Sequence, residues 1–155
     1  MDINMGLSKE QRETMAKAVT ALLADTYALY FKTHAYHWNV TGPRFHDLHT
    51  MFEEQYTELW TATDDIAERI RALGVLAPIS YEEMGASAKI KHDSATPDAN
   101  TMVANLVAGH EQVVRTARDA LKLAEEHGDE ATSDLIAPRI TLHEKTAWML
   151  RATLG

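Results

Sequence analysis

Residues 37–74 read HWNVTGPRFHDLHTMFEEQYTELWTATDDIAERIRALG and contain the end of one helix, a tight turn and a second long helix. Gly42 and Pro43 mark the turn, because glycine permits unusual backbone angles and proline suits the first turn of a helix. The apolar stripe of the second helix comprises Phe45, Leu48, Phe52, Leu59, Ile66, Ile70 and Leu73. Two long helices joined by a tight turn pack as antiparallel neighbours, which is a typical beginning of a helical bundle.

Further helical segments lie on both sides of this pair. The expected helices span residues of about 8–38, 44–73, 80–86, 98–127 and 130–152. Ser8 and Gln11 have the spacing of a capping box, which places the start of the first helix. Ser80 and Glu83 have the same spacing and predict a short helix within an otherwise aperiodic connection.

The lengths of the connections indicate how the long helices are arranged. The first and last connections are short, whereas residues 75–97 are long enough to cross the whole bundle. A short, a long and then another short connection is typical of a ferritin-like four-helix bundle rather than a simple up-down bundle. We therefore expect an all-α chain with one ferritin-like domain over residues 1–155 and a short helix in its crossover.

The composition excludes several classes of protein and of site. With 45% apolar and 25% charged residues, the chain is typical of a soluble globular domain rather than a disordered one. No apolar run reaches the length of a membrane span, and the start of the chain lacks a secretion signal. We therefore expect a cytoplasmic location, either free in the cytoplasm or associated with the nucleoid. The chain has no cysteine, so histidine and carboxylate are the available metal ligands.

The second helix carries two pairs of candidate metal ligands. His49 and Glu53 are four residues apart, as are Asp64 and Glu68, so each pair shares a helix face. The centres of the two pairs are about 22 Å apart along a helix, so one chain cannot easily close a site around both. Two copies crossed antiparallel near Glu58 would place His49 and Glu53 of one copy opposite Asp64 and Glu68 of the other.

Each candidate also has a simpler explanation. His37 continues an apolar stripe and could be a hydrogen-bonded core residue, while His49 and Glu53 could be an ordinary polar pair. Asp64 and Glu68 could form a solvated acidic face. Taken together, however, the imidazoles and carboxylates suit a metal ion such as Fe(II), Zn(II) or Mn(II).

Two observations favour a site between subunits. No glutamate in the chain has a histidine three residues later, so the Glu-x-x-His motif of a di-iron centre inside one bundle is absent. Tyr56 and Trp60 lie outside the core stripe of the second helix, near the expected two-fold axis. They either bury against a second copy of this helix or widen the core stripe.

The spacing of these residues resembles the motif of the Dps family, the miniature ferritins known as DNA-binding proteins from starved cells. The match consists of His37-Trp38-Asn39, a histidine twelve residues after the first, and then Asp64 and Glu68. This resemblance implies a hollow homododecamer with an iron-oxidising ferroxidase site at each two-fold interface. It assigns His37 and His49 to one subunit and Asp64 and Glu68 to its mate. Glu53 stands where the family often has aspartate, so a carboxylate is kept but reaches farther.

The resemblance also implies what the protein does. It predicts an enzyme, a ferroxidase that oxidises Fe(II) with hydrogen peroxide in preference to O2 and stores Fe(III) as a mineral, protecting the cell from oxidative damage. Trp38 corresponds to the family tryptophan beside the site and would supply electrons. Glu126, Glu130 and Asp134 resemble acidic residues of the family's three-fold pores, although a solvated helix terminus explains them equally well.

DNA binding is implied by the family's name, but this sequence does not support it. Members that bind DNA tightly commonly use a basic terminal tail, whereas this chain has no such tail and a net charge of −8. Weak or absent DNA binding is therefore expected. The alternative hypothesis is a DNA-binding protein of the nucleoid whose metal binding is secondary.

Overall fold

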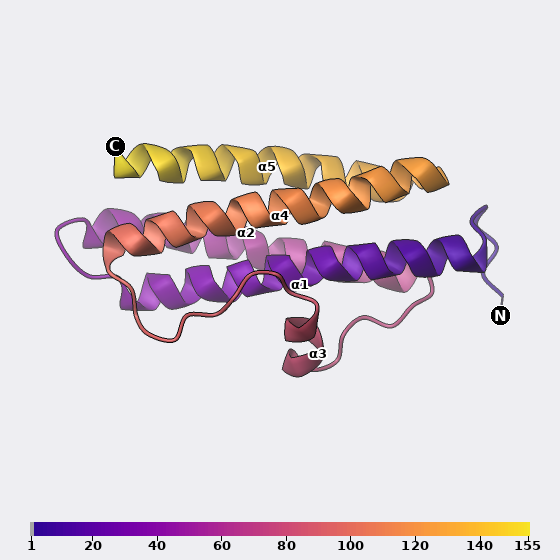
Figure 1. The fold of residues 1–155 in the computed structure, drawn as a ribbon, viewed down its shortest axis with the longest axis horizontal. Coiled ribbons are helices and arrows are strands. Elements are labelled where there is room, and N and C mark those ends of the chain that lie inside the picture. The colour runs from indigo at the N-terminus through magenta and orange to yellow at the C-terminus, as the bar shows by residue number, and fades with distance from the viewer. Residues whose placement is uncertain (1) are drawn as a thin grey trace.

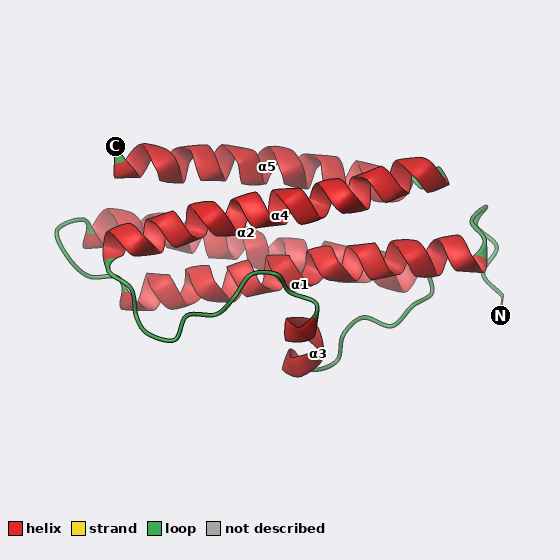
Figure 2. Ribbon diagram, viewed as in Figure 1, coloured by secondary structure: helices red, strands yellow, loops and turns green. Residues whose placement is uncertain are grey.

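The computed structural model describes residues 2–155, which fold into a bundle of four long helices with one short helix in a connection (Figure 1). The helices are α1 (Lys9–Asn39), α2 (Phe45–Ala72), α3 (Tyr81–Ala86), α4 (Ala99–His127) and α5 (Glu130–Leu154). The described residues contain helices and loops and no strands (Figure 2). This architecture confirms the expected all-α ferritin-like fold.

The path of the chain gives the bundle its topology. The short turn after α1 makes α2 run antiparallel to it, and the long connection then crosses the bundle so that α4 runs parallel to α2 (Figure 1). A short turn makes α5 antiparallel to α4. None of these helices combines the length and the apolar character that crossing a lipid bilayer requires, within the part of the chain that the structure describes.

Local hydrogen bonds set where the helices begin. The Ser8 hydroxyl accepts from the Gln11 backbone and the Gln11 side chain accepts from the Ser8 backbone, which confirms the predicted capping box of α1. Ser80 likewise caps α3, accepting from the Glu83 backbone N–H. Asp98 does the same for α4, accepting from Thr101.

The core lies along the centre of the bundle and is mainly apolar, with a few buried polar side chains. Its largest fully buried side chains are Phe52, Met15, Leu22, Leu23, Leu29, Leu48, Leu59, Ile66, Ile70, Leu73, Met102 and Leu106. Most of the stripe predicted for α2 is therefore buried. Phe45 is the exception, because it is the first residue of α2 and 45% of its surface is exposed.

A buried carboxylate fastens the long connection to the bundle. Asp25 in α1 is fully buried, and its Oδ1 accepts hydrogen bonds from the backbone N–H groups of Lys89 and Ile90 at 2.7 and 3.0 Å. Its Oδ2 accepts from the Thr116 hydroxyl of α4 at 2.6 Å. Asp25 thus links α1, α4 and the segment that follows α3. The hydrogen bonds to both of its oxygens compensate for burying the charged carboxylate.

Candidate metal centre

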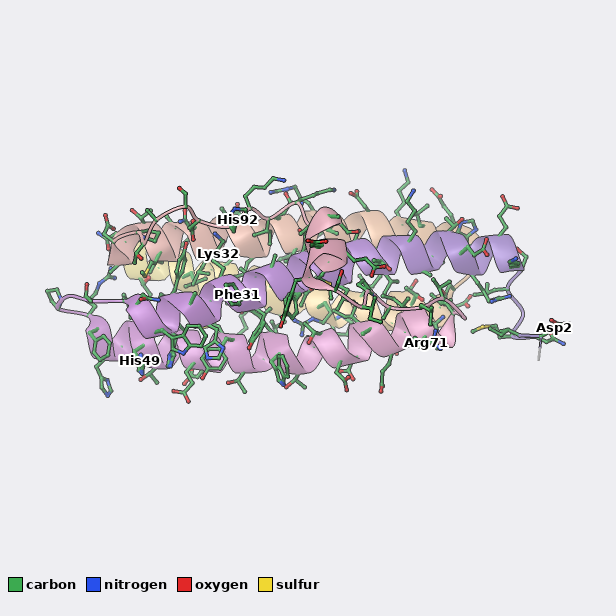
Figure 3. The ribbon with its side chains drawn as sticks, turned by 90° about the horizontal axis from the view of Figure 1, so that it is seen from below. Asp2, Phe31, Lys32, His49, Arg71 and His92 are labelled. Atoms are coloured by element: carbon green, nitrogen blue, oxygen red, sulfur yellow. The ribbon has the colours of Figure 1, made fainter. Side chains whose placement is uncertain are left out.

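The end of α1 and the start of α2 bring His37 and His49 into direct contact. Their imidazole rings are stacked with centroids 3.7 Å apart and planes inclined by 17°. His37 Nδ1 lies 2.7 Å from the His49 carbonyl oxygen, and His49 Nδ1 lies 2.8 Å from the His37 carbonyl oxygen. Figure 3 shows His49 on α2 near the turn that joins the two helices.

These reciprocal hydrogen bonds determine which ring nitrogens carry protons. A carbonyl oxygen only accepts, so Nδ1 of both histidines must donate. In the neutral imidazole the lone pair then resides on Nε2, which is free to bind a metal ion. A ring N–H held by a backbone carbonyl is the usual arrangement for histidines that ligate metals, because it fixes both the tautomer and the ring orientation. His37 and His49 are therefore preorganised as a candidate pair of nitrogen ligands.

The turn between α1 and α2 is anchored to the opposite end of the chain. Gly42 has a φ of 107°, in the region that favours glycine, which lets the chain reverse. Arg44, just before α2, donates to the Thr153 carbonyl oxygen at 2.7 Å and to the Asn100 side chain. These contacts hold the histidine pair in place relative to α4 and α5.

Aromatic rings surround the histidine pair. Phe45 stacks on His49 with ring centroids 5.0 Å apart, which explains why it leaves the core, contrary to the sequence prediction. Tyr56 lies edge-on to His37 at 5.1 Å. Trp38 is 59% exposed, and its ring centroid lies 4.2 Å from that of His34. Its role beside the site stays a prediction.

The predicted carboxylate ligands lie on the surface. Glu53, Asp64 and Glu68 are all exposed side chains of α2. Burial raises the pKa of the Tyr56 phenol, and the nearby Glu53 carboxylate raises it further. Within residues 2–155, no three or more histidine, aspartate or glutamate side chains come together as a metal-binding group. Within the described residues, one chain thus brings the two candidate nitrogen ligands together and leaves Asp64 and Glu68 apart from them.

The acidic residues around the α4–α5 turn have two different environments. Glu126, Glu130 and Asp134 are exposed, and the prediction that they line a pore stays a prediction. Asp129 is only 3% exposed; it caps α5 by accepting from the Thr132 N–H and pairs with Arg69 of α2 at 2.7 Å. Asp129 thus both caps α5 and joins it to α2.

The structure also reveals a buried histidine pair that has no metal-ligand spacing in the sequence. His110 of α4 and His143 of α5 are each 1% exposed, and their Nδ1 atoms are 2.8 Å apart. Arg139 Nη2 donates to His143 Nε2 at 3.1 Å, and the same guanidinium binds both carboxylate oxygens of Glu58. The only sequence signal was the presence of both histidines on apolar stripes.

Arg139 determines which ring nitrogens of His110 and His143 carry protons. Because Arg139 only donates, His143 Nε2 accepts and His143 Nδ1 carries the proton, which it donates to His110 Nδ1. His110 therefore holds its own proton on Nε2 and offers no lone pair to a metal there. Burial, together with the charge of Arg139, lowers the pKa of His110 to about 3. Burial, His110 and Arg139 hold the pKa of His143 well below its ordinary value. Both rings are neutral at physiological pH.

We expect the bundle to lose stability in mild acid because of this pair. Below about pH 6.5, the ordinary histidine pKa, these histidines bind protons in the unfolded chain. In the folded chain His110 stays neutral until about pH 3. Each histidine should then remove up to about 1.4 kcal/mol of unfolding free energy per pH unit. Denaturant unfolding followed from pH 8 to pH 4 measures this loss.

The matched variants for this prediction are the double change His110→Leu with His143→Gln and the single change His92→Gln. The double variant should flatten the acid dependence, whereas exposed His92 should leave it as it is. An identical slope in the double variant and the native chain would contradict the assignment.

Comparisons with known proteins place this geometry in a wider context. The profile of the ferritin-like domain matches residues 16–155. A low temperature-induced protein of Nostoc is 43% identical over 152 residues, covering 97% of this chain and 85% of its own length. DNA protection during starvation protein 2 of Bacillus anthracis is 37% identical, covering 96% of this chain and 99% of its own. The crystal structure of a Dps protein from Vibrio cholerae, described as a member of the ferritin-like diiron-carboxylate superfamily, superposes with a TM-score of 0.94 at 38% identity, covering 100% of this chain and 98% of that one.

Proposed function

Because this chain belongs to the Dps family of ferritin-like proteins, we propose that it oxidises Fe(II) at sites shared between two subunits and stores the Fe(III) inside a hollow homododecamer. The observation that carries the proposal is the preorganised pair His37 and His49. Their Nε2 lone pairs are free, and within residues 2–155 no cluster of carboxylates joins them to complete a site. The proposal therefore takes the remaining ligands from another molecule.

A second copy of α2 provides them. Crossed antiparallel about a two-fold axis near Glu58, it would bring its own Asp64 and Glu68 opposite His37 and His49, and the symmetry would create two such sites. The surface of α1 and α2 supports this contact, because Trp60 is 57% exposed and Phe31 is 56% exposed. Contact with a second copy would cover these apolar side chains.

The proposed ligands match the chemistry of iron oxidation. Imidazole nitrogens bind Fe(II), and carboxylates bind it while favouring the more highly charged Fe(III) product. Exposed Glu53 adds a carboxylate one turn from His49. Hydrogen peroxide is the proposed oxidant: two Fe(II) ions give it one electron each, its O–O bond breaks, and two protons complete two water molecules.

The mass of the purified protein and its iron chemistry test the proposal together. We expect a particle of about 208 kDa, which is twelve times the mass of the 17.3 kDa chain. We also expect Fe(II) and hydrogen peroxide to be consumed in the fixed ratio that the reaction above requires. Sedimentation velocity and stopped-flow absorbance measure the two quantities. A monomer, or a shell that fails to accelerate Fe(II) oxidation, would refute the proposal.

DNA binding should be weak or absent at physiological ionic strength. Some relatives are named for DNA protection during starvation, but this chain has a net charge of −8 and repels phosphates except where cations cluster. Protein and plasmid mixed at 150 mM salt should migrate separately on a gel. A retarded or condensed plasmid would instead support the alternative of a nucleoid-binding protein.

A further inference from the structure

A chain of aromatic rings leads away from the proposed metal centre between α1 and α2. Tyr56 lies 5.1 Å from His37, and His34 stacks on Tyr56 with centroids 3.8 Å apart and planes inclined by 15°. Tyr30 follows, one helical turn before His34, with its ring 5.7 Å from the His34 ring and 6.5 Å from Tyr56. The rings thus form a continuous path along which an electron can move.

One member of this chain has a base in hydrogen-bonding contact. The Tyr30 hydroxyl lies 3.1 Å from His34 Nδ1. A phenol is the stronger donor of the two and an imidazole nitrogen the stronger acceptor, so Tyr30 donates and His34 accepts.

This contact matters because oxidising a tyrosine requires removing its proton as well as an electron. Tyr27, one turn earlier in α1, is also half-buried and lies 5.7 Å from Tyr30, but its other aromatic neighbour is a phenol, Tyr81, with ring centroids 6.5 Å apart. Tyr30 therefore differs from its neighbour in having a base for its proton.

We infer that Tyr30, with His34 as its proton acceptor, delivers a single electron to the metal centre when too little Fe(II) is present to reduce peroxide completely. This inference rests on the proposed iron oxidation. In the balanced step, the O–O bond of hydrogen peroxide breaks with one electron from Fe(II) and one from Tyr30. The phenolic proton passes to His34, solvent supplies two protons, and the products are Fe(III), two water molecules and a neutral tyrosyl radical.

The consequence is a second, protective activity of the site. Reduction of peroxide by one electron alone would release a hydroxyl radical, whereas an electron from Tyr30 completes the reduction to water. The unpaired electron is then held on a phenol that is half-buried between α1 and α2.

Freeze-quench electron paramagnetic resonance tests the inference. The assembled protein is given less than one Fe(II) per site and then hydrogen peroxide. We expect a tyrosyl signal that narrows when the protein contains ring-deuterated tyrosine. The signal should be lost in Tyr30→Phe and in His34→Phe, which removes the base while keeping an aromatic ring against Tyr56.

Tyr27→Phe is the matched control, because it alters a neighbouring phenol without removing the Tyr30–His34 hydrogen bond. Loss of the signal in Tyr30→Phe with retention in Tyr27→Phe supports the inference. Retention in Tyr30→Phe, equal loss in Tyr27→Phe, or a tryptophan radical in the native protein overturns it. Failure of the native protein to oxidise Fe(II) at full loading would instead overturn the proposed function.

Discussion

Replacing either His49 or Asp64 with alanine should abolish iron oxidation, although the two side chains belong to separate parts of one chain. His49 Nε2 is one of the two proposed nitrogen ligands, and Asp64 is proposed to reach the same ion from the other copy of α2. Loss of a group that merely orients a ligand typically costs about 10- to 100-fold in affinity or activity, so loss of a ligand should cost more than about 100-fold.

Exposed neighbours of the same residue types provide the controls. His46 and Asp65 are exposed side chains of α2 beside the proposed ligands, and neither belongs to the proposed site. Stopped-flow absorbance should show normal Fe(II) oxidation in His46→Ala and Asp65→Ala at the native particle mass. Native rates in His49→Ala or Asp64→Ala would remove these residues from the mechanism.

Mixing two inactive variants should restore activity, which distinguishes a shared site from one within a chain. In a dimer of His49→Ala with Asp64→Ala, one site carries both lesions and the other carries neither. Random assembly of equal amounts makes half of the dimers mixed, so the mixture should recover about a quarter of the native sites.

The measurement compares variants that are unfolded and refolded together with variants refolded separately and then combined. Only the joint refolding should recover the activity, because subunits must exchange to form mixed dimers. A pair of lesions in the same half-site, His37→Ala with His49→Ala, is the control and should stay inactive in either procedure. Equal inactivity of the complementary mixture would argue against a site built across the dyad.

The parts of this structure that depend on local spacing were predictable from the sequence. The Ser8–Gln11 capping box and the apolar stripe of α2 follow from helical periodicity, and both are confirmed. Phe45 was wrongly placed in the core, because periodicity cannot register that a residue at the first position of a helix is free to stack on His49.

Contacts between helices required coordinates. The reciprocal bonds of His37 and His49 to each other's carbonyl oxygens depend on the angle at which α1 meets α2. The His110–His143 pair likewise depends on the relative register of α4 and α5, which no spacing within a single helix encodes. Sequence reasoning could place candidate side chains on a face but could not identify their partners.

The separation of the two proposed nitrogen ligands, His37 and His49, from Asp64 and Glu68 within one polypeptide has a consequence for biogenesis. A newly synthesised subunit would hold only an incomplete centre, so it should react slowly with iron and peroxide before it meets its mate. Oxidant chemistry would begin only after association, when a compartment exists to retain the ferric product. In this protein, quaternary assembly would thus prevent iron oxidation from starting before a compartment exists to retain its product.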